Sequence, residues 1–244
     1  MGFGEIAILV AGALAGGIVN GLTGFGTAIT ALGIWVYAIA PTTAASLAIV
    51  CSVVSQLQTL HLIWRAINWP RVLVFVIPGV VGVPLGTLLL PHIDPRFFKL
   101  GLGFFLVVYP AYVLMRKGQI ESAWGGRAAD GMVGFGGGVL GGLTGLSGVL
   151  PVVWTDVRGW TKAQRRGVVQ FFNIAILSLA LLSHAASGLL TRQLAVDALI
   201  ALPATIAGAW SGAYIYRRLA DRGYQRAVMA LLLVSGAALL WTSW

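Results

Sequence analysis

The chain has 244 residues, of which 58% are hydrophobic and 9% charged, and its mean hydropathy is +0.90. Soluble domains carry about 25% charged residues, so this chain has too few to cover a water-facing surface. The composition excludes a disordered chain, a nucleic-acid-binding module and most cytosolic enzymes. It predicts an all-α integral membrane protein with most of its mass in lipid.

The first half of the chain opens with an apolar region that is too long for one helix. Residues 5–39 exceed the roughly 20 residues that cross the hydrocarbon layer, so we interpret them as a hairpin that enters and leaves on the same side. Three full spans are predicted after it, at 43–64, 72–92 and 97–115. Repeat one of the predicted fold therefore covers about 1–115.

A linker at 116–130 separates this half from a second half of the same design. Glycine interrupts the apolar region 131–155, which we also interpret as a hairpin. Three further spans are predicted after it, at 168–187, 195–216 and 224–242. Because each half crosses the membrane an odd number of times, the second half is expected to be inverted relative to the first.

The positions of the basic residues support two hairpins and give an orientation. Thirteen of the 16 Lys and Arg residues then fall in loops on one side of the membrane. They are Arg65, Arg71, Arg116, Lys117, Arg127, Arg158, Lys162, Arg165, Arg166, Arg217, Arg218, Arg222 and Arg226. Since cytoplasmic loops are enriched in Lys and Arg, we interpret these residues first as topology signals and expect both termini outside the cytoplasm.

An internal repeat relates the two halves. Gly21-Leu-Thr-Gly24 matches Gly142-Leu-Thr-Gly145 at an offset of 121 residues. Further along, Gly82-x-x-x-Gly86 parallels Gly208-x-x-x-Gly212 at an offset of 126. Inverted repeats are typical of secondary transporters, whose substrate site lies near the midplane between the repeats. Repeat two covers about 131–244, within a single domain of residues 1–244.

The glycine-rich turns at 21–26 and 141–148 carry the predicted site. A turn at membrane depth needs its polar backbone groups satisfied by protein or by water in a cavity. A helix that restarts after such a turn presents unpaired N–H groups and the positive end of its dipole. Two inverted turns would aim two such ends at the middle, which suits an anion. Helix packing through GxxxG pairs is the alternative for these glycines.

Uncharged side chains near the turns could add hydrogen-bond donors. They are Asn20, Thr23 and Thr27 in the first half and Thr144 and Ser147 in the second. Four polar residues on full spans either line the site or bridge helices: Ser52, Gln56, Gln170 and Asn173. No carboxylate falls in the middle of a predicted span, so we expect no metal site and no cofactor. Any coupling would use histidines such as His61 or His184, backbone sites, or only the gradient of the anion itself.

In the type and placement of its two turns, at Asn20–Gly26 and Gly136–Gly148, the whole chain resembles the TauE/SafE family of sulfite exporters. That family is also called the 4-toluene sulfonate uptake permease family. The resemblance implies a permease of the bacterial inner membrane, here with periplasmic termini, that exports or exchanges sulfite, an organosulfonate or a related small anion.

Carried onto this chain, the resemblance places the substrate on both turns. The implied residues are Thr23, Gly24, Phe25, Gly26 and Thr27 in the first turn and Thr144, Gly145, Leu146, Ser147 and Gly148 in the second. The two turns are unequal, because Phe25-Gly26 stands against Leu146-Ser147. The small anion and the lipid bilayer are the expected partners, and nucleic acid is not.

Two other functions stay open from the residues alone. Gly145-Leu-Ser147-Gly148 matches the turn of rhomboid intramembrane proteases, which would make Ser147 a nucleophile and His184 its base. The repeat already accounts for this turn, so we do not expect an enzyme. A non-transporting membrane scaffold is the second alternative, although the longest predicted loop, 116–130, is too short for a docking domain.

Overall fold

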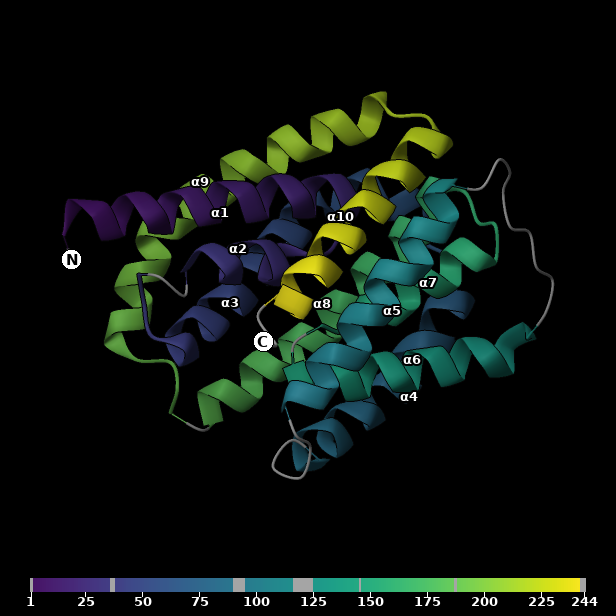
Figure 1. The fold of residues 1–244 in the computed structure, drawn as a ribbon, viewed down its shortest axis with the longest axis horizontal. Helices are drawn as coiled ribbons and strands as arrows, with labels where there is room; N and C mark the ends of the chain where they lie inside the picture. The colour runs from purple at the N-terminus through teal and green to yellow at the C-terminus, as the bar shows by residue number, and fades with distance from the viewer. Residues whose placement is uncertain are drawn as a thin grey trace.

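The computed structural model describes residues 2–35, 38–89, 95–115, 125–144, 146–186 and 188–241. These residues form ten α-helices and two short 3-10 helices, and no strand occurs among them (Figure 1). The first half contains α1 (Phe3–Thr23), α2 (Thr27–Trp35), α3 (Pro41–Thr59), η1 (Leu60–Leu62), η2 (Trp64–Ala66), α4 (Trp69–Leu89) and α5 (Pro95–Met115). The second half contains α6 (Gly126–Thr144), α7 (Val149–Val157), α8 (Lys162–Ala186), α9 (Arg192–Arg218) and α10 (Asp221–Trp241).

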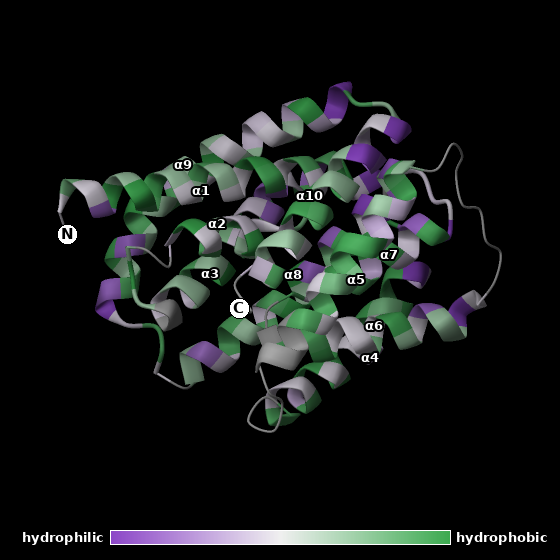
Figure 2. Ribbon diagram, viewed as in Figure 1, coloured by the Kyte–Doolittle hydropathy of each residue, from purple (hydrophilic) through white to green (hydrophobic). Residues whose placement is uncertain are grey.

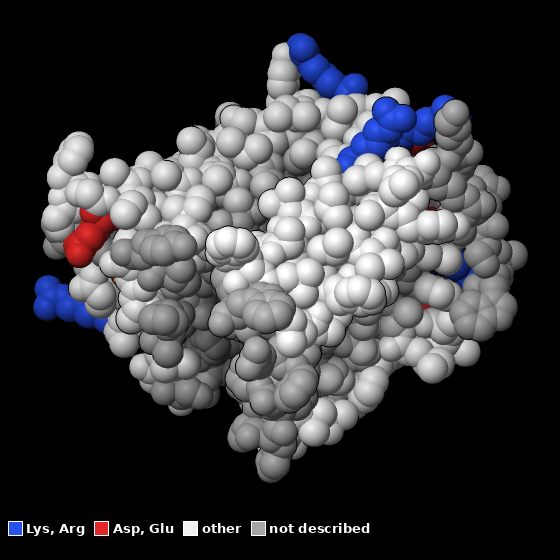
Figure 3. All heavy atoms as spheres, viewed as in Figure 1, with Lys and Arg blue, Asp and Glu red and all other residues white. Residues whose placement is uncertain are grey.

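The helices have the length and composition of a multi-pass membrane protein. Among the described residues, five segments are long and apolar enough to cross a bilayer: Phe3–Thr23, Thr43–Leu62, Trp69–Leu89, Lys162–Ala186 and Arg192–Arg218. Helices α5 and α10 occupy the other two predicted spans, and each has 21 residues. Apolar residues run along most helices in Figure 2. On the face drawn in Figure 3, charged side chains lie around the margins and the described surface between them is uncharged.

Both glycine-rich regions fold back on themselves as the sequence predicts. Helix α2 returns along α1, and the indole nitrogen of Trp35 donates to the carbonyl of Leu9 at 2.9 Å. Helix α7 returns along α6, and the indole nitrogen of Trp154 donates to Asp130 at 2.6 Å. The arms are unequal, because α1 has 21 residues and α2 has nine. The sequence predicts that all of 5–39 forms one hairpin that enters and leaves on the same side. In the structure α1 by itself is long and apolar enough to cross a bilayer.

The two halves exchange helices in a symmetric pattern. The first helix of each half packs on the fourth helix of the other, so α1 lies beside α9 and α6 lies beside α4 (Figure 1). The third and fifth helices pair with their own counterparts, α3 with α8 and α5 with α10. Two halves with the same order of helices would give equivalent contacts of this kind in both directions. Their inversion relative to a membrane stays a prediction.

Glycine allows the exchanged helices to approach closely. A Cβ at Gly21 of α1 would overlap the carbonyl oxygen of Ala209 in α9. A Cβ at Gly142 of α6 would likewise overlap the carbonyl oxygen of Val83 in α4. Small residues at helix crossings let backbones pack tightly in a membrane, where lipid removes the usual hydrophobic drive. The packing alternative therefore holds for Gly21 and Gly142, which lie near the start of the predicted turns, whereas Gly24, Gly26 and Gly148 have a different role.

Two helices begin before the predicted segments, so the prediction makes both of them too short. Helix α6 begins at Gly126, inside the predicted linker, and α8 begins at Lys162 instead of 168. A hydropathy window stops at the first charged residues, but Lys, Gln and Arg are good helix formers and continue the helix. As a result Arg165 and Arg166, predicted in a solvated loop, lie in α8 and are buried.

Candidate functional site

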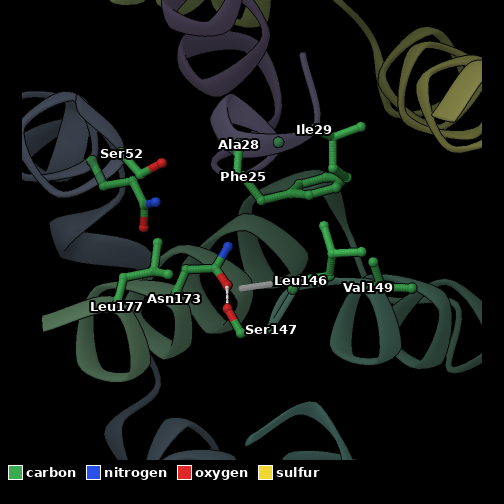
Figure 4. A pocket seen from close by; sticks show the side chains of 12 residues that line it. Phe25, Ala28, Ile29, Ser52, Leu146, Ser147, Val149, Asn173 and Leu177 are labelled. Atoms are coloured by element: carbon green, nitrogen blue, oxygen red, sulfur yellow. Dashed lines mark hydrogen bonds between the residues drawn. The ribbon is translucent and has the colours of Figure 1, made fainter. Parts of the chain in front are cut away.

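A small cavity lies where the two turns meet (Figure 4). Each half contributes one turn, the start of the helix that follows it, and a stretch of its third helix. The lining residues are Phe25, Gly26, Ala28, Ile29, Ser52 and Gln56 from the first half and Leu146, Ser147, Gly148, Val149, Asn173 and Leu177 from the second. The cavity volume is about 20 Å³, which is room for about one water molecule. In this conformation the cavity is therefore too small for a sulfur oxyanion.

The first turn depends on two glycines in the left-handed region. Helix α1 ends at Thr23 and is capped by Gly24, whose φ is 82° and whose N–H donates to the carbonyl of Asn20 at 2.7 Å. Gly26 follows with a φ of 91°. Only glycine adopts such angles without steric cost, so these two positions turn the chain back toward α2. Phe25 between them is buried and forms part of the cavity wall.

Three polar residues at the first turn are used within the hairpin. The Thr23 hydroxyl lies 2.8 Å from the carbonyl of Val19 and 2.7 Å from that of Phe25. The Asn20 amide nitrogen donates to the Thr27 hydroxyl at 2.6 Å, bracing α1 against α2. None of Asn20, Thr23 and Thr27 borders the cavity. Of the predicted first-turn residues, the structure brings Phe25 and Gly26 to the cavity and keeps the polar ones behind them.

The second turn places a hydrogen-bonded pair in the cavity wall. The Ser147 hydroxyl donates to the side-chain oxygen of Asn173 at 2.7 Å. This hydrogen bond holds the amide oxygen toward Ser147. The amide nitrogen of Asn173, on the other branch of the same group, therefore points away from Ser147 into the cavity (Figure 4). A Cβ on Gly148 would lie 2.8 Å from this nitrogen and 3.3 Å from the Cβ of Phe25, so the close approach requires glycine there. Gly145 and the side chain of Thr144 lie outside the described residues.

The cavity combines apolar side chains with a few polar groups. Ala28 and Ile29 lie in the first turn of α2, and Gly148 and Val149 lie at the start of α7, so the starts of two nine-residue helices border one space. The first N–H groups of a helix lack partners within it and carry a partial positive charge. None of the lining side chains is ionisable. Together with the amide of Asn173, these helix starts favour a small anion over a cation.

The two predicted glutamines have different positions. Gln56 lines the cavity, and its side-chain oxygen is buried without a partner among the described residues. Gln170 lies one layer back, where its amide nitrogen donates to the backbone oxygen of Gln56 at 2.7 Å and to the Thr59 hydroxyl at 3.1 Å. Gln170 therefore bridges α8 and α3 in this conformation.

Sequence reasoning missed a buried charge beside the first turn. The Arg166 side chain is fully buried, donates to the oxygen of Gln170 at 3.1 Å and lies over the ring of Tyr216 at 4.1 Å. Arg166, Gln170 and Asn173 have the spacing i, i+4 and i+7, which puts them on one face of α8. Extending the polar stripe of Gln170 and Asn173 by one turn would have found it.

The pair of residues that a serine hydrolase would need is not formed. The Ser147 hydroxyl is bonded to Asn173, whereas the Nδ1 atom of His184 lies 2.9 Å from the Ser46 hydroxyl. Asn173 and His184 are separated by about 16 Å along the axis of α8. A nucleophile needs its base within hydrogen-bond reach, so the geometry gives this alternative no support. The described residues also contain no group of three or more His, Cys, Asp or Glu side chains that could hold a metal ion.

Comparison with known proteins shows the family of the chain. The model of the family described as "Sulfite exporter TauE/SafE" matches residues 8–239, which is nearly the whole chain. Comparison with curated proteins and with solved structures gave no match. Because the match covers both hairpins and all the helices that bring them together, the chain belongs to the sulfite exporter TauE/SafE family of membrane transporters.

Proposed function

We propose that this protein is a secondary transporter that exports a small sulfur-containing or organic anion, such as sulfite or an organosulfonate, across a bacterial inner membrane. Its two halves act as inverted repeats, both termini lie in the periplasm, and the cavity between the turns is the substrate site. The observation that carries the proposal is the meeting of both turns, Ser52, Gln56 and Asn173 around one space.

The chemistry of the cavity suits an oxyanion. Two helix starts supply backbone N–H donors, and Asn173 supplies an amide nitrogen that Ser147 orients. Hydrogen bonds to an ionised group are stronger than those between neutral groups, so several such donors can replace part of the hydration of an anion. Because the donors are uncharged, the anion can also leave, which a transporter requires.

Transport needs a change of conformation, because the present cavity is too small for the substrate. In inverted-repeat transporters one group of helices rocks against another around a fixed site. The turns of this chain sit on the exchanged helix pairs α1–α9 and α6–α4, so movement of one pair relative to the other would separate Phe25 from Gly148. That separation would enlarge the cavity and open it to one side.

Transport across the membrane of proteoliposomes tests the proposal. The purified protein is reconstituted, and efflux of labelled sulfite, sulfate, sulfoacetate and an aryl sulfonate is measured with and without a pH gradient. We expect saturable flux of at least one sulfur oxyanion or sulfonate. Ser147→Ala should lower it about tenfold, because Asn173 loses the bond that orients its donors. Absence of flux for the whole panel in folded protein would contradict the proposal.

A further inference from the structure

The buried guanidinium of Arg166 has an unused donor. Its Nε atom donates to Gln170, and its Nη1 atom lies 3.5 Å from the carbonyl of Leu22 at the end of α1. Its Nη2 atom is buried and has no hydrogen-bond partner among the described residues. The residue itself has no solvent exposure. An unsatisfied charged donor in such a place is costly unless something else occupies it.

The neighbouring arginine shows what a compensated charge looks like in the same helix. Arg165 forms an ion pair with Asp156, and its Nε atom donates to the carbonyl of Trp160 at 2.6 Å. No carboxylate in the described parts of the chain forms an ion pair with Arg166. Two successive arginines are therefore buried, and the described residues provide a counter-ion for only one of them.

Gln170 connects Arg166 to two cavities. Its amide oxygen accepts from Arg166, while its amide nitrogen contacts the backbone of Gln56 and the hydroxyl of Thr59. Gln56 lines the cavity between the turns. Thr59 lines a larger cavity of about 370 Å³, which also includes His61, Tyr214 and Arg217. The bridge made by Gln170 thus holds together one residue of each cavity, Gln56 of the smaller one and Thr59 of the larger one.

The first turn lies directly against this bridge. A Cβ on Gly24 would lie 3.2 Å from the Cγ atom of Arg166 and 3.2 Å from the Cβ atom of Gln170. The Tyr224 hydroxyl donates to the carbonyl of Thr23 at 3.0 Å, closing the other side of the same region. Movement of the first turn would therefore uncover the guanidinium and loosen the bridge together.

Resting on the proposed function, we infer that Arg166 is a second anion site, placed between the larger cavity and the cavity at the turns. It takes one small oxyanion, sulfite or the head group of a sulfonate, on its free Nη2 donor. The planar fork of a guanidinium fits two oxygens of such a group. Gln170 is the partition that must release Gln56 and Thr59 before the anion passes to Asn173. The charge of the buried guanidinium thus holds the anion while it passes from one cavity to the other.

Sulfite binding to purified variants tests this site. Binding is measured in detergent by an equilibrium isotherm and by the rise of the thermal midpoint with sulfite concentration. Arg166→Gln should weaken binding tenfold or more, and Arg166→Lys should weaken it several-fold because it keeps the charge but not the fork. The matched control is the double variant Asp156→Asn with Arg165→Gln, which removes the neighbouring charged pair and should leave the affinity within about twofold.

The outcomes separate this site from the proposed function. If both Arg166 variants bind sulfite like the wild type while the wild type transports it, Arg166 only caps the end of α1 and the inference is overturned. If Arg166→Gln does not fold, Arg166→Lys decides by the same isotherm. If the folded wild type neither binds nor transports any anion of the panel, the proposed function fails together with this site.

Discussion

The turn at Gly24–Gly26 and the turn at Leu146–Gly148 occupy equivalent places in the two halves but are built from different chemistry. The first reverses the chain with two left-handed glycines and keeps its polar side chains inside the hairpin. The second carries Ser147 where the first has Gly26, and this hydroxyl holds the cavity-facing amide of Asn173. Phe25 and Leu146, at matching positions, both line the cavity.

A similar contrast applies to the helices behind the turns. At the offset of 121 residues, Asn173 of α8 corresponds to Ser52 of α3, and Arg166 corresponds to Ala45. The amide that Ser147 orients and the buried charge therefore both come from α8. The packing of the two halves is nearly equivalent, whereas their polar groups are not. The fold supplies a symmetric frame, and the asymmetric side chains give the second half alone the Ser147–Asn173 pair and the buried Arg166.

Breaking the packing should affect the two halves equally. Gly21→Val and Gly142→Val each push a branched side chain into the backbone of a neighbouring helix, at Ala209 and at Val83. Overpacking of this kind costs about 2–3 kcal/mol, and a close backbone contact cannot easily move. We expect both variants to lose most of their folded, monodisperse protein in size-exclusion chromatography. A tolerated valine in one half alone would show that the exchanged pairs are not equivalent.

Changing the charge of the cavity should affect the second half strongly. Asn173→Asp places a carboxylate where the site would hold an anion, and two like charges about 4 Å apart repel by several kcal/mol in a partly shielded environment. Sulfite flux in proteoliposomes should fall about 100-fold or more at neutral pH. The control is Asn173→Ser, which copies Ser52 of the other half and should lower flux only about tenfold. Retained sulfite flux in Asn173→Asp would rule out the cavity as the anion site.

Exchanging the residues of the two turns should separate stability from binding. Gly26→Ser introduces a side chain at a φ of 91°, close to Val19 and Leu231. It should cost about 1–2 kcal/mol of stability, seen as a lower thermal midpoint. Ser147→Gly keeps an ordinary backbone and should mainly weaken sulfite binding. The reverse pattern, with binding lost in Gly26→Ser and stability lost in Ser147→Gly, would contradict the division of roles between the turns.

The smallest effect is expected at the histidine beyond the cavity. His184 contacts Ser46, about 16 Å along α8 from Asn173. We expect His184→Ala to change sulfite flux less than twofold, with the same response to a pH gradient as the wild type. If the response to the gradient disappears while flux at equal pH persists, His184 takes part in coupling after all.

The sequence predicts the hairpins and turns well, because glycine clusters and the repeat mark them directly. Ser147, Asn173, Ser52 and Gln56 come together at the cavity, as their positions on turns and spans indicate. The sequence could not show that Asn20, Thr23 and Thr27 form hydrogen bonds within the hairpin and not with the cavity. Such bonds depend on backbone and side-chain angles, which the spacing of residues does not reveal.

Arg166 was missed for a different physical reason. Its charge made it count as a loop residue, and burial of an arginine depends on partners that are distant in the sequence, here Tyr216 and Leu22. The ion pair of Arg165 with Asp156 depends in the same way on the return of α8 past the end of α7. Charge-counting rules for topology treat such residues as solvated and therefore cannot find them.

A structure determined with bound sulfite tests the central claim most directly. Density maps from wild-type protein in saturating sulfite are compared with maps from Asn173→Ser under the same conditions. We predict an oxyanion between the first turns of α2 and α7, within hydrogen-bond distance of the Asn173 amide nitrogen, and its loss in the variant. An empty, unchanged cavity in protein that transports sulfite, with the anion bound away from both turns, would contradict the account.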